Sequence, residues 1–139
     1  MSNIFSIARR SFSIALMAVL TACAAHATTP TPTQFNLPDG SALAARVWSH
    51  AKPQHIVLGV HGFNDYSKSF ERLAQHLAAE TQATVYAYDQ RGFGANPQPG
   101  VWPGSEELIN NLRYIAAQLR ERYPGLPLTV IGESMGGAV

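Results

Sequence analysis

The chain has 139 residues, of which 46% are hydrophobic and 14% charged, and its formal net charge is +1. This composition is typical of one modest globular domain and excludes collagen, coiled coils and charged disordered tails. The near-neutral charge provides no electrostatic footprint for nucleic acid. Because the chain has a single cysteine, an internal disulfide and a cysteine-based zinc site are excluded. Nothing in the sequence implies a metal or an organic cofactor.

Residues 1–22 have the pattern of a signal peptide. Arg9 and Arg10 precede an apolar run over residues 11–20, and no acidic residue occurs in this part of the chain. The run is shorter than the ~20 residues that a membrane-spanning helix needs, so an export signal is the better interpretation. A buried amphipathic helix is the alternative. The Thr/Pro-rich segment that follows, within residues 23–33, favours the signal, because it is typical of an extended linker.

Two processing sites compete at the end of this signal. Residues 20–23 (LTAC) resemble the lipobox of bacterial lipoproteins, in which the cysteine is lipidated and becomes the mature N-terminus. Residues 25–27 (AHA) instead match the site of an ordinary signal peptidase. We favour lipidation of Cys23, which predicts an exported protein held to a membrane by its lipid chains. Cleavage after Ala27 would release a soluble periplasmic or secreted protein.

From residue 34 to residue 139 the pattern alternates between strands and helices. Two short strands around an Asp-Gly turn predict a β-hairpin, over residues 35–37 and 42–48. Residues 55–60 form a continuous apolar run, typical of a strand buried on both faces of a parallel sheet. Two more strands are predicted, over residues 84–88 and 128–131.

Two helices are predicted between these strands. In the first, apolar residues recur at helical spacing from Phe70 to Ala78, with Ser67 or Ser69 as the N-cap. The second has Ser105 as its cap, acidic residues in its first turn and arginines in its last. Its expected buried stripe consists of Leu108, Leu112, Ile115, Ala116 and Leu119. A hairpin followed by β-α-β-α-β predicts an α/β fold.

Residues 132–136 (GESMG) match the pattern G-x-S-x-G directly after a predicted strand. A serine on a strained turn between strand and helix leaves no room for side chains two positions away, which is why glycine is needed there. Such a turn exposes the Ser134 hydroxyl as a nucleophile. A plain glycine-rich turn is the alternative. The position of the motif after the third strand of the α/β pattern favours the nucleophile.

A second turn, His61-Gly62-Phe63, follows the first buried strand. A serine nucleophile of this kind needs backbone N–H groups that stabilise the oxyanion of the tetrahedral intermediate. One comes from the residue after the serine, which is Met135, and one from the loop after an earlier strand, for which Phe63 is the candidate. Taken alone, this turn would be interpreted as structural. Because the G-x-S-x-G motif is also present, we favour a catalytic role for it.

These two turns, together with residues 88–94 (YDQRGFG) and 123–127 (YPGLP), resemble the α/β-hydrolase superfamily. The greatest resemblance is to its monoacylglycerol lipase/lysophospholipase-like branch, and it covers residues 34–139. It implies a serine esterase or lipase that acts on a small-molecule or lipid ester, with Ser134 as nucleophile and the Phe63 and Met135 amides as oxyanion hole. It also implies that the turn over residues 89–94 is structural.

Four positions depart from the pattern of this branch. Glu133 and Phe93 each stand where histidine is usual, and Asn64-Asp65 replaces Gly-Glu. These departures weaken a claim of monoacylglycerol specificity and leave lysophospholipids and related lipids open. An acyltransferase or a peptidase of this fold would use the same machinery. A haloalkane dehalogenase is disfavoured, because that chemistry needs aspartate in place of Ser134.

In this fold the catalytic acid and histidine follow the serine along the chain. Only five residues follow Ser134, so we expect both partners to lie beyond residue 139 and the present chain to be inactive by itself. Residues 34–139 would then be the N-terminal half of an α/β-hydrolase fold, ending at the nucleophile turn. His61 and Asp89 precede the serine and are not assigned to the triad. A non-enzymatic envelope lipoprotein with a degenerate hydrolase fold is the alternative class, and the intact motif argues against it.

Overall fold

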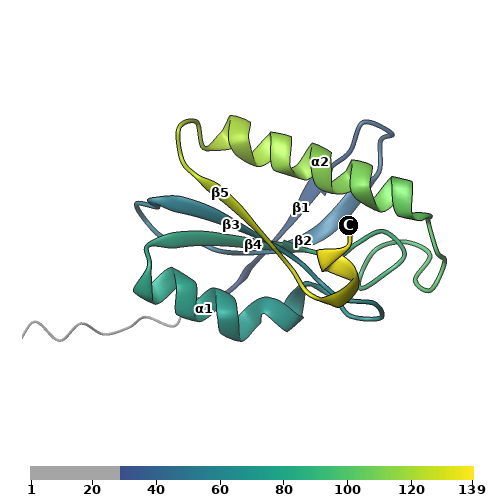
Figure 1. The fold of residues 1–139 in the computed structure, drawn as a ribbon, viewed down its shortest axis with the longest axis horizontal. Coiled ribbons are helices and arrows are strands. Elements are labelled where there is room, and N and C mark those ends of the chain that lie inside the picture. Colours follow the sequence, from purple (N-terminus) through teal and green to yellow (C-terminus); the bar gives the residue numbers. More distant parts are fainter. Residues whose placement is uncertain (1–28) are drawn as a thin grey trace, which may run out of the picture.

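The computed structural model of the protein describes residues 29–139, which form a five-stranded mixed sheet with one helix on each face (Figure 1). The strand order is β1-β2-β4-β3-β5. The α/β architecture expected from the sequence is confirmed. In chain order the elements are β1 (Thr31–Asn36), β2 (Ala42–Trp48), β3 (His55–Val60), the 3₁₀ turn η1 (Ser67–Phe70), α1 (Glu71–Glu80), β4 (Ala83–Tyr88), α2 (Ser105–Arg122), β5 (Leu128–Gly132) and the 3₁₀ turn η2 (Ser134–Gly137).

The register of the sheet aligns the carboxyl ends of its three parallel strands. Val60, the last residue of β3, is paired with Tyr88 at the end of β4 and with Gly132 at the end of β5. The β1–β2 hairpin is antiparallel and joins the sheet through β4. In open α/β sheets, ligands bind outside the carboxyl ends of the strands. The loops that follow Val60, Tyr88 and Gly132 are therefore the place to look for a site.

The first strand begins earlier than the sequence predicts. Thr31, Pro32 and Thr33, which we assigned to the linker over residues 23–33, already belong to β1, and Thr31 is paired with Val47. Linker and edge strand share an extended backbone, and an edge strand tolerates proline, so the sequence pattern does not separate the two. The signal peptide over residues 1–22 and the lipidation site at Cys23 lie outside the described residues. Within residues 29–139, no helix has the length and apolar character needed to cross a membrane.

The first helix differs from its prediction at its start and on its buried face. A 3₁₀ turn precedes α1, and neither Ser67 nor Ser69 caps it with its side chain. The Ser67 backbone N–H instead donates to Asp89, and the Ser69 hydroxyl donates to the carbonyl oxygen of Tyr66. α1 buries Ala74 and Ala78 against the sheet, as the predicted apolar stripe requires, whereas Leu73, which belongs to the same stripe, is 39% exposed.

The second helix follows its prediction more closely. The acidic first turn and basic last turn are confirmed, but the residue at the N-cap is Gly104 and not Ser105. Four of the five expected stripe residues are buried, Leu112 is partly buried, and Asn111 is buried in addition. Gly104 has φ of 93°, a backbone conformation that serine rarely adopts. Backbone geometry at Gly104 therefore sets the start of α2.

Each face of the sheet carries its own hydrophobic core. The core beneath α2 centres on Phe35, Leu58, Tyr88, Ile115 and Leu119, and the core beneath α1 centres on Trp48, Val57, Phe70 and Val85. β3 and β4 lie between both cores; the burial predicted for β3 is confirmed, and β4 is buried along its whole length as well. β5 differs, because its residues are exposed or only partly buried along its whole length. Within the described residues β5 is an edge strand, paired on one side only.

Candidate active site

The turn after β5 has the strained geometry that the G-x-S-x-G pattern predicts. Glu133 is extended, and Ser134 has φ of 51°, in the left-handed region that side-chain-bearing residues rarely occupy. Ser134 is exposed and lies two residues after the end of β5 at Gly132. The backbone thus turns sharply at the serine and presents its hydroxyl to solvent, as a nucleophile requires.

Both glycines of the motif are required by close backbone contacts. A Cβ atom at Gly132 would lie 2.2 Å from the carbonyl oxygen of Gly136. A Cβ atom at Gly136 would lie 2.1 Å from the carbonyl oxygen of Val60, at the end of β3. The next residue, Gly137, is different, since its nearest neighbour would be at an ordinary 3.5 Å. The tight turn therefore packs its own backbone, at Gly136, against the end of β3.

The loop after β3 lies directly beside this turn. The Glu133 N–H donates to the Val60 carbonyl oxygen at 3.0 Å, and a Cβ atom at Gly62 would lie 3.5 Å from the Cβ atom of Ser134. No hydrogen bond within residues 29–139 uses the backbone N–H of Phe63 or of Met135 as its donor. Two N–H groups on the loops that flank Ser134 are thus available to an oxygen atom of a bound substrate.

His61 has a structural role beside the site. Its side chain is fully buried, and its Nε2 atom accepts a hydrogen bond of 2.9 Å from the Gln90 backbone N–H. Because Nε2 accepts, the proton is assigned to Nδ1, which lies 2.7 Å from the carbonyl oxygen of Gly62. Both ring nitrogens are therefore engaged within the protein. His61 is not placed to act as the base for Ser134.

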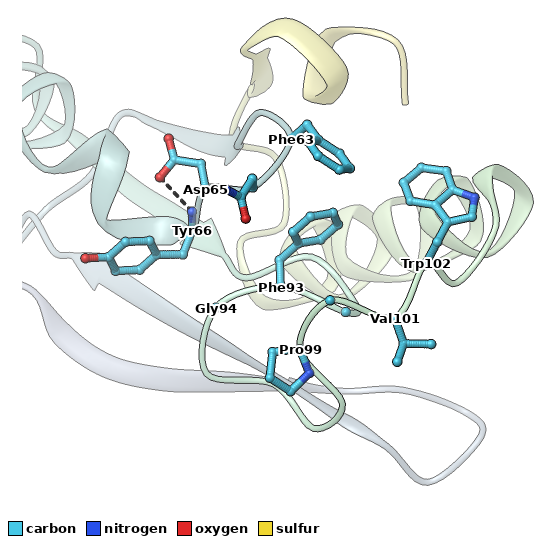
Figure 2. A pocket seen from close by; sticks show the side chains of 11 residues that line it. Phe63, Asp65, Tyr66, Phe93, Gly94, Pro99, Val101 and Trp102 are labelled. Atoms are coloured by element: carbon cyan, nitrogen blue, oxygen red, sulfur yellow. Dashed lines mark hydrogen bonds between the residues drawn. The ribbon is translucent and has the colours of Figure 1, made fainter.

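An aromatic pocket of about 250 Å³ opens between the loop after β3 and the loop after β4 (Figure 2). Phe63 and Phe93 form one wall, with their rings edge to face at 5.6 Å, and Val101 and Trp102 stand across from them. The Phe63 side chain is 69% exposed and Trp102 is 51% exposed. We call this space the aromatic pocket. The departure noted at Phe93, where histidine is usual, thus adds an apolar wall.

Asp89, at the end of β4, organises the loop that forms the second wall. It is buried, and its two carboxylate oxygens accept hydrogen bonds from the backbone N–H groups of Ser67 at 2.7 Å and Ala95 at 2.8 Å. A Cβ atom at Gly94 would lie 2.2 Å from the Asp89 carboxylate. Asn96 connects this loop to β2, because its Oδ1 atom accepts a hydrogen bond of 2.8 Å from the Ala44 backbone N–H. The structural turn implied by the resemblance has this physical basis.

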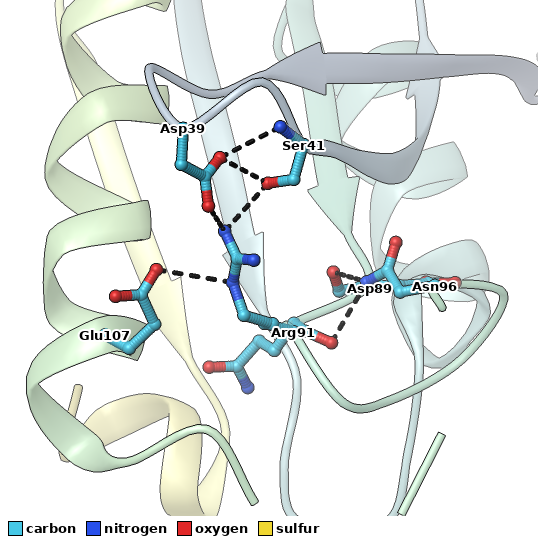
Figure 3. A network of polar contacts seen from close by, with 7 residues as sticks. Asp39, Ser41, Asp89, Arg91, Asn96 and Glu107 are labelled. Atoms are coloured by element: carbon cyan, nitrogen blue, oxygen red, sulfur yellow. Dashed lines mark hydrogen bonds and ion pairs between the residues drawn. The ribbon is translucent and has the colours of Figure 1, made fainter. Parts of the chain in front are cut away.

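Arg91 joins three parts of the chain next to this turn (Figure 3). Its Nη2 atom lies 2.8 Å from Asp39 Oδ2 and 2.8 Å from the Ser41 hydroxyl in the β1–β2 turn. Its Nε atom lies 3.3 Å from Glu107 Oε1 on α2. Hydrogen bonds from Ser41, with a smaller contribution from Arg91, hold the pKa of Asp39 below its usual value. Sequence reasoning missed this network, because its members lie far apart in the chain.

The described residues contain no group of three or more metal-ligating side chains that could hold a metal ion. Among residues 29–139, the site consists of one exposed serine on a strained turn, two backbone N–H groups that donate no hydrogen bond there, and an aromatic pocket. On the mixed sheet observed here, these features define an α/β hydrolase. The family described as serine aminopeptidase S33 matches residues 51–139, and the chain belongs to this family.

Relatives with curated functions agree with this class. Human monoglyceride lipase is 29% identical over 103 residues, which cover 73% of this chain and 34% of the human protein. A monoacylglycerol lipase of Mycolicibacterium smegmatis is 30% identical over 95 residues, covering 67% of this chain and 34% of that protein. The chain thus spans about a third of the length of these relatives.

A solved structure gives the same result for the fold. A soluble variant of monoglyceride lipase from Saccharomyces cerevisiae, in complex with a substrate analogue, superimposes with a TM-score of 0.68 at 30% identity. The match covers 81% of this chain and 38% of the yeast chain. Together, the family and these relatives support a hydrolase of the lipase and esterase type.

Proposed function

We propose that the full-length protein is a serine hydrolase that cleaves carboxylic esters of lipid-like substrates, such as monoacylglycerols or lysophospholipids. The observation that carries the proposal is the left-handed backbone of Ser134, with φ of 51°, beside the unused N–H groups of Phe63 and Met135. Left-handed backbone at a residue other than glycine is uncommon and clusters at functional sites. The lipase relatives support the substrate class.

In the proposed mechanism the Ser134 hydroxyl attacks the ester carbonyl carbon and transfers its proton to a histidine base. The Phe63 and Met135 N–H groups donate to the oxyanion, and each donor contributes roughly 2.7–4 kcal/mol by comparison with a protease. The C–O bond to the alcohol then breaks as the protonated histidine donates its proton to the leaving oxygen, which leaves an acyl group on Ser134 and a neutral alcohol. Water, deprotonated by the same histidine, releases the fatty acid and restores the serine.

The histidine and its acidic partner are proposed to follow residue 139, in the order serine, acid, histidine. Residues 29–139 by themselves would retain at most a residual ~10³–10⁴-fold rate enhancement from the oxyanion hole and binding. The mechanism needs no metal ion and no organic cofactor.

A fluorophosphonate probe tests the nucleophile in the full-length protein. We expect labelling of the wild type, loss of labelling in Ser134→Ala, and unchanged labelling in Ser49→Ala, which removes an exposed hydroxyl elsewhere. Fatty acid released from a monoacylglycerol and from a lysophospholipid would rank the two substrates. A wild-type protein that is folded but not labelled would refute the proposed serine hydrolase activity. A non-enzymatic envelope lipoprotein would then be the remaining interpretation.

The serine aminopeptidase description of the matching family favours one second candidate, a peptidase that uses the same Ser134. Its acyl-enzyme would form from an amide instead of an ester. Comparing release of p-nitroaniline from aminoacyl anilides with release of p-nitrophenol from acyl esters distinguishes the two. Greater turnover of the anilides would replace the esterase proposal.

We also propose that the protein is exported and is anchored to a membrane by lipid at Cys23. Substitution Cys23→Ser should move the protein from the membrane fraction to the soluble fraction. Retention in the membrane fraction would refute anchoring at this residue, and solubility of the wild type would favour cleavage after Ala27.

A further inference from the structure

We propose that the aromatic pocket binds the hydrocarbon chain of the ester substrate and that Trp102 sets the chain length accepted. This inference rests on the proposed function, because it assigns a binding role next to Ser134. The pocket lies between Phe63 and Phe93 on one side and Val101 and Trp102 on the other (Figure 2). A chain in this space would cover aromatic surface that the described residues leave exposed.

The position of the pocket connects it to the site of chemistry. Phe63 lines it and also carries one of the two unused N–H groups. Trp102 lines it and also borders a smaller cavity of about 70 Å³, together with Met135, which carries the other N–H group. Trp102 therefore borders one cavity with each of the two residues proposed to hold the carbonyl oxygen. The aromatic pocket is thus adjacent to the position proposed for that carbonyl group, within reach of a chain attached to it.

The loop that carries Val101 and Trp102 is held in place by its own backbone. The Gly100 N–H donates to the Gly92 carbonyl oxygen at 2.8 Å, and a Cβ atom at Gly92 would lie 2.2 Å from the Val101 carbonyl oxygen. Gly92 has φ of 82°, which glycine adopts at little cost. Arg91 ties the start of the same loop to the hairpin and to α2. The wall is therefore preformed, which lowers the entropic cost of binding.

Charge and size define the occupant further. Asp65 is the one charged residue that lines the pocket, and no lysine, arginine or histidine does so. An anionic phosphate group would be repelled there, whereas a hydrocarbon chain would not. If each methylene group occupies roughly the 30 Å³ that a water molecule takes up in the liquid, the pocket volume of about 250 Å³ holds a chain of about eight carbons. The pocket therefore fits a neutral chain of medium length.

Two ester series test this in the full-length protein, one with acyl groups of two to twelve carbons on p-nitrophenol and one with acetates of longer alcohols. In the series whose chain enters the pocket, kcat/KM of the wild type should rise about fourfold for each added methylene and level off near eight carbons. In the Trp102→Ala variant, kcat/KM should increase less with each added methylene than in the wild type. Tyr114→Ala, which removes an aromatic residue of similar 48% exposure on α2, should behave as the wild type.

The series that Trp102→Ala alters identifies the chain as the acyl or the alcohol part, and either result supports the proposal. A chain-length profile identical in wild type and Trp102→Ala in both series would overturn it. Because fluorophosphonate labelling of Ser134 is scored separately, labelling without this dependence would leave the proposed esterase standing.

A binding measurement independent of turnover uses the tryptophan itself. Trp102 is 51% exposed, whereas Trp48, the other tryptophan of the described residues, is 0% exposed. In the Ser134→Ala protein, mono-octanoylglycerol should shift the emission to shorter wavelength and reduce quenching by acrylamide, whereas glycerol should do neither. The additional change Trp102→Phe should abolish both effects. An unchanged spectrum with mono-octanoylglycerol would overturn the proposal even if the esters are hydrolysed.

Discussion

His61 and Gln90 hold the ends of the two central strands together. The Gln90 backbone N–H donates to His61 Nε2 at 2.9 Å, and the Gln90 side-chain amide donates to the His61 carbonyl oxygen at 2.7 Å. The first residue leads into the loop of Phe63, and the second leads into the loop of Phe93. The two walls of the candidate site are thus connected by a buried pair of hydrogen bonds.

Replacing His61 by alanine should destabilise the fold by about 1–3 kcal/mol, because the buried Gln90 N–H loses its acceptor. Urea unfolding of the full-length protein measures this. The exposed histidine of α1 supplies the control, since His76→Ala should stay within about 0.5 kcal/mol of the wild type. Equal stability of the two variants would contradict the structural role given to His61.

A pair of neighbouring glycines tests the nucleophile turn. Gly136→Ala forces a Cβ atom to 2.1 Å from the Val60 carbonyl oxygen, so the turn must move and labelling of Ser134 should fall by at least tenfold. Gly137→Ala places its Cβ atom at 3.5 Å from its nearest neighbour and should label close to the wild-type rate. The rate of fluorophosphonate labelling is the measurement, and similar rates for both variants would count against the turn geometry.

Asp89→Asn keeps the shape of the side chain but removes an acceptor from a buried position. Its amide group cannot accept from both the Ser67 and Ala95 N–H groups, so stability should fall by about 1.5–3 kcal/mol. Asp65→Asn, at a carboxylate that accepts from the next N–H in the chain, should cost less. If Asp89 were instead the triad acid, kcat would fall about 10⁴-fold at unchanged stability.

The lowered pKa of Asp39 predicts that the contacts among Arg91, Asp39 and Ser41 contribute to the stability of the fold in a pH-dependent way. Because this pKa is lowered in the folded protein, the stabilisation is present above the ordinary value of 3.8 and is lost as pH falls below it. The difference in urea midpoint between wild type and Asp39→Asn should therefore be larger at pH 6 than at pH 3. Since the Ser41 hydrogen bonds are the main cause, the difference should persist in 1 M salt. A difference that vanishes in salt would assign it to Arg91 instead.

Strand and helix positions were largely predictable because hydrophobic periodicity is a local property of the chain. The buried runs of β3 and β4 and the charged ends of α2 are examples. Helix starts were less predictable, because Gly104 begins α2 through its backbone conformation and Ser67 is drawn to Asp89 across the fold. The exposure of β5 was not predictable either, since the pattern of one strand does not reveal whether neighbours cover it.

The sequence by itself determined the place of the candidate nucleophile. Two glycines around Ser134, placed after an apolar strand, form a local pattern, and a local backbone constraint is visible in the residues that satisfy it. The G-x-S-x-G spacing therefore predicted the strained turn before any tertiary contact was known.

Tertiary structure alone decided what surrounds that serine. His61 became a buried structural residue because Gln90, 29 positions away, occupies its Nε2 atom. Phe63 and Trp102 became opposite walls of one pocket because the register of β3 and β4 aligns the ends from which their loops begin. Such contacts depend on how strands are paired in space, and residue spacing along the chain carries no record of that pairing.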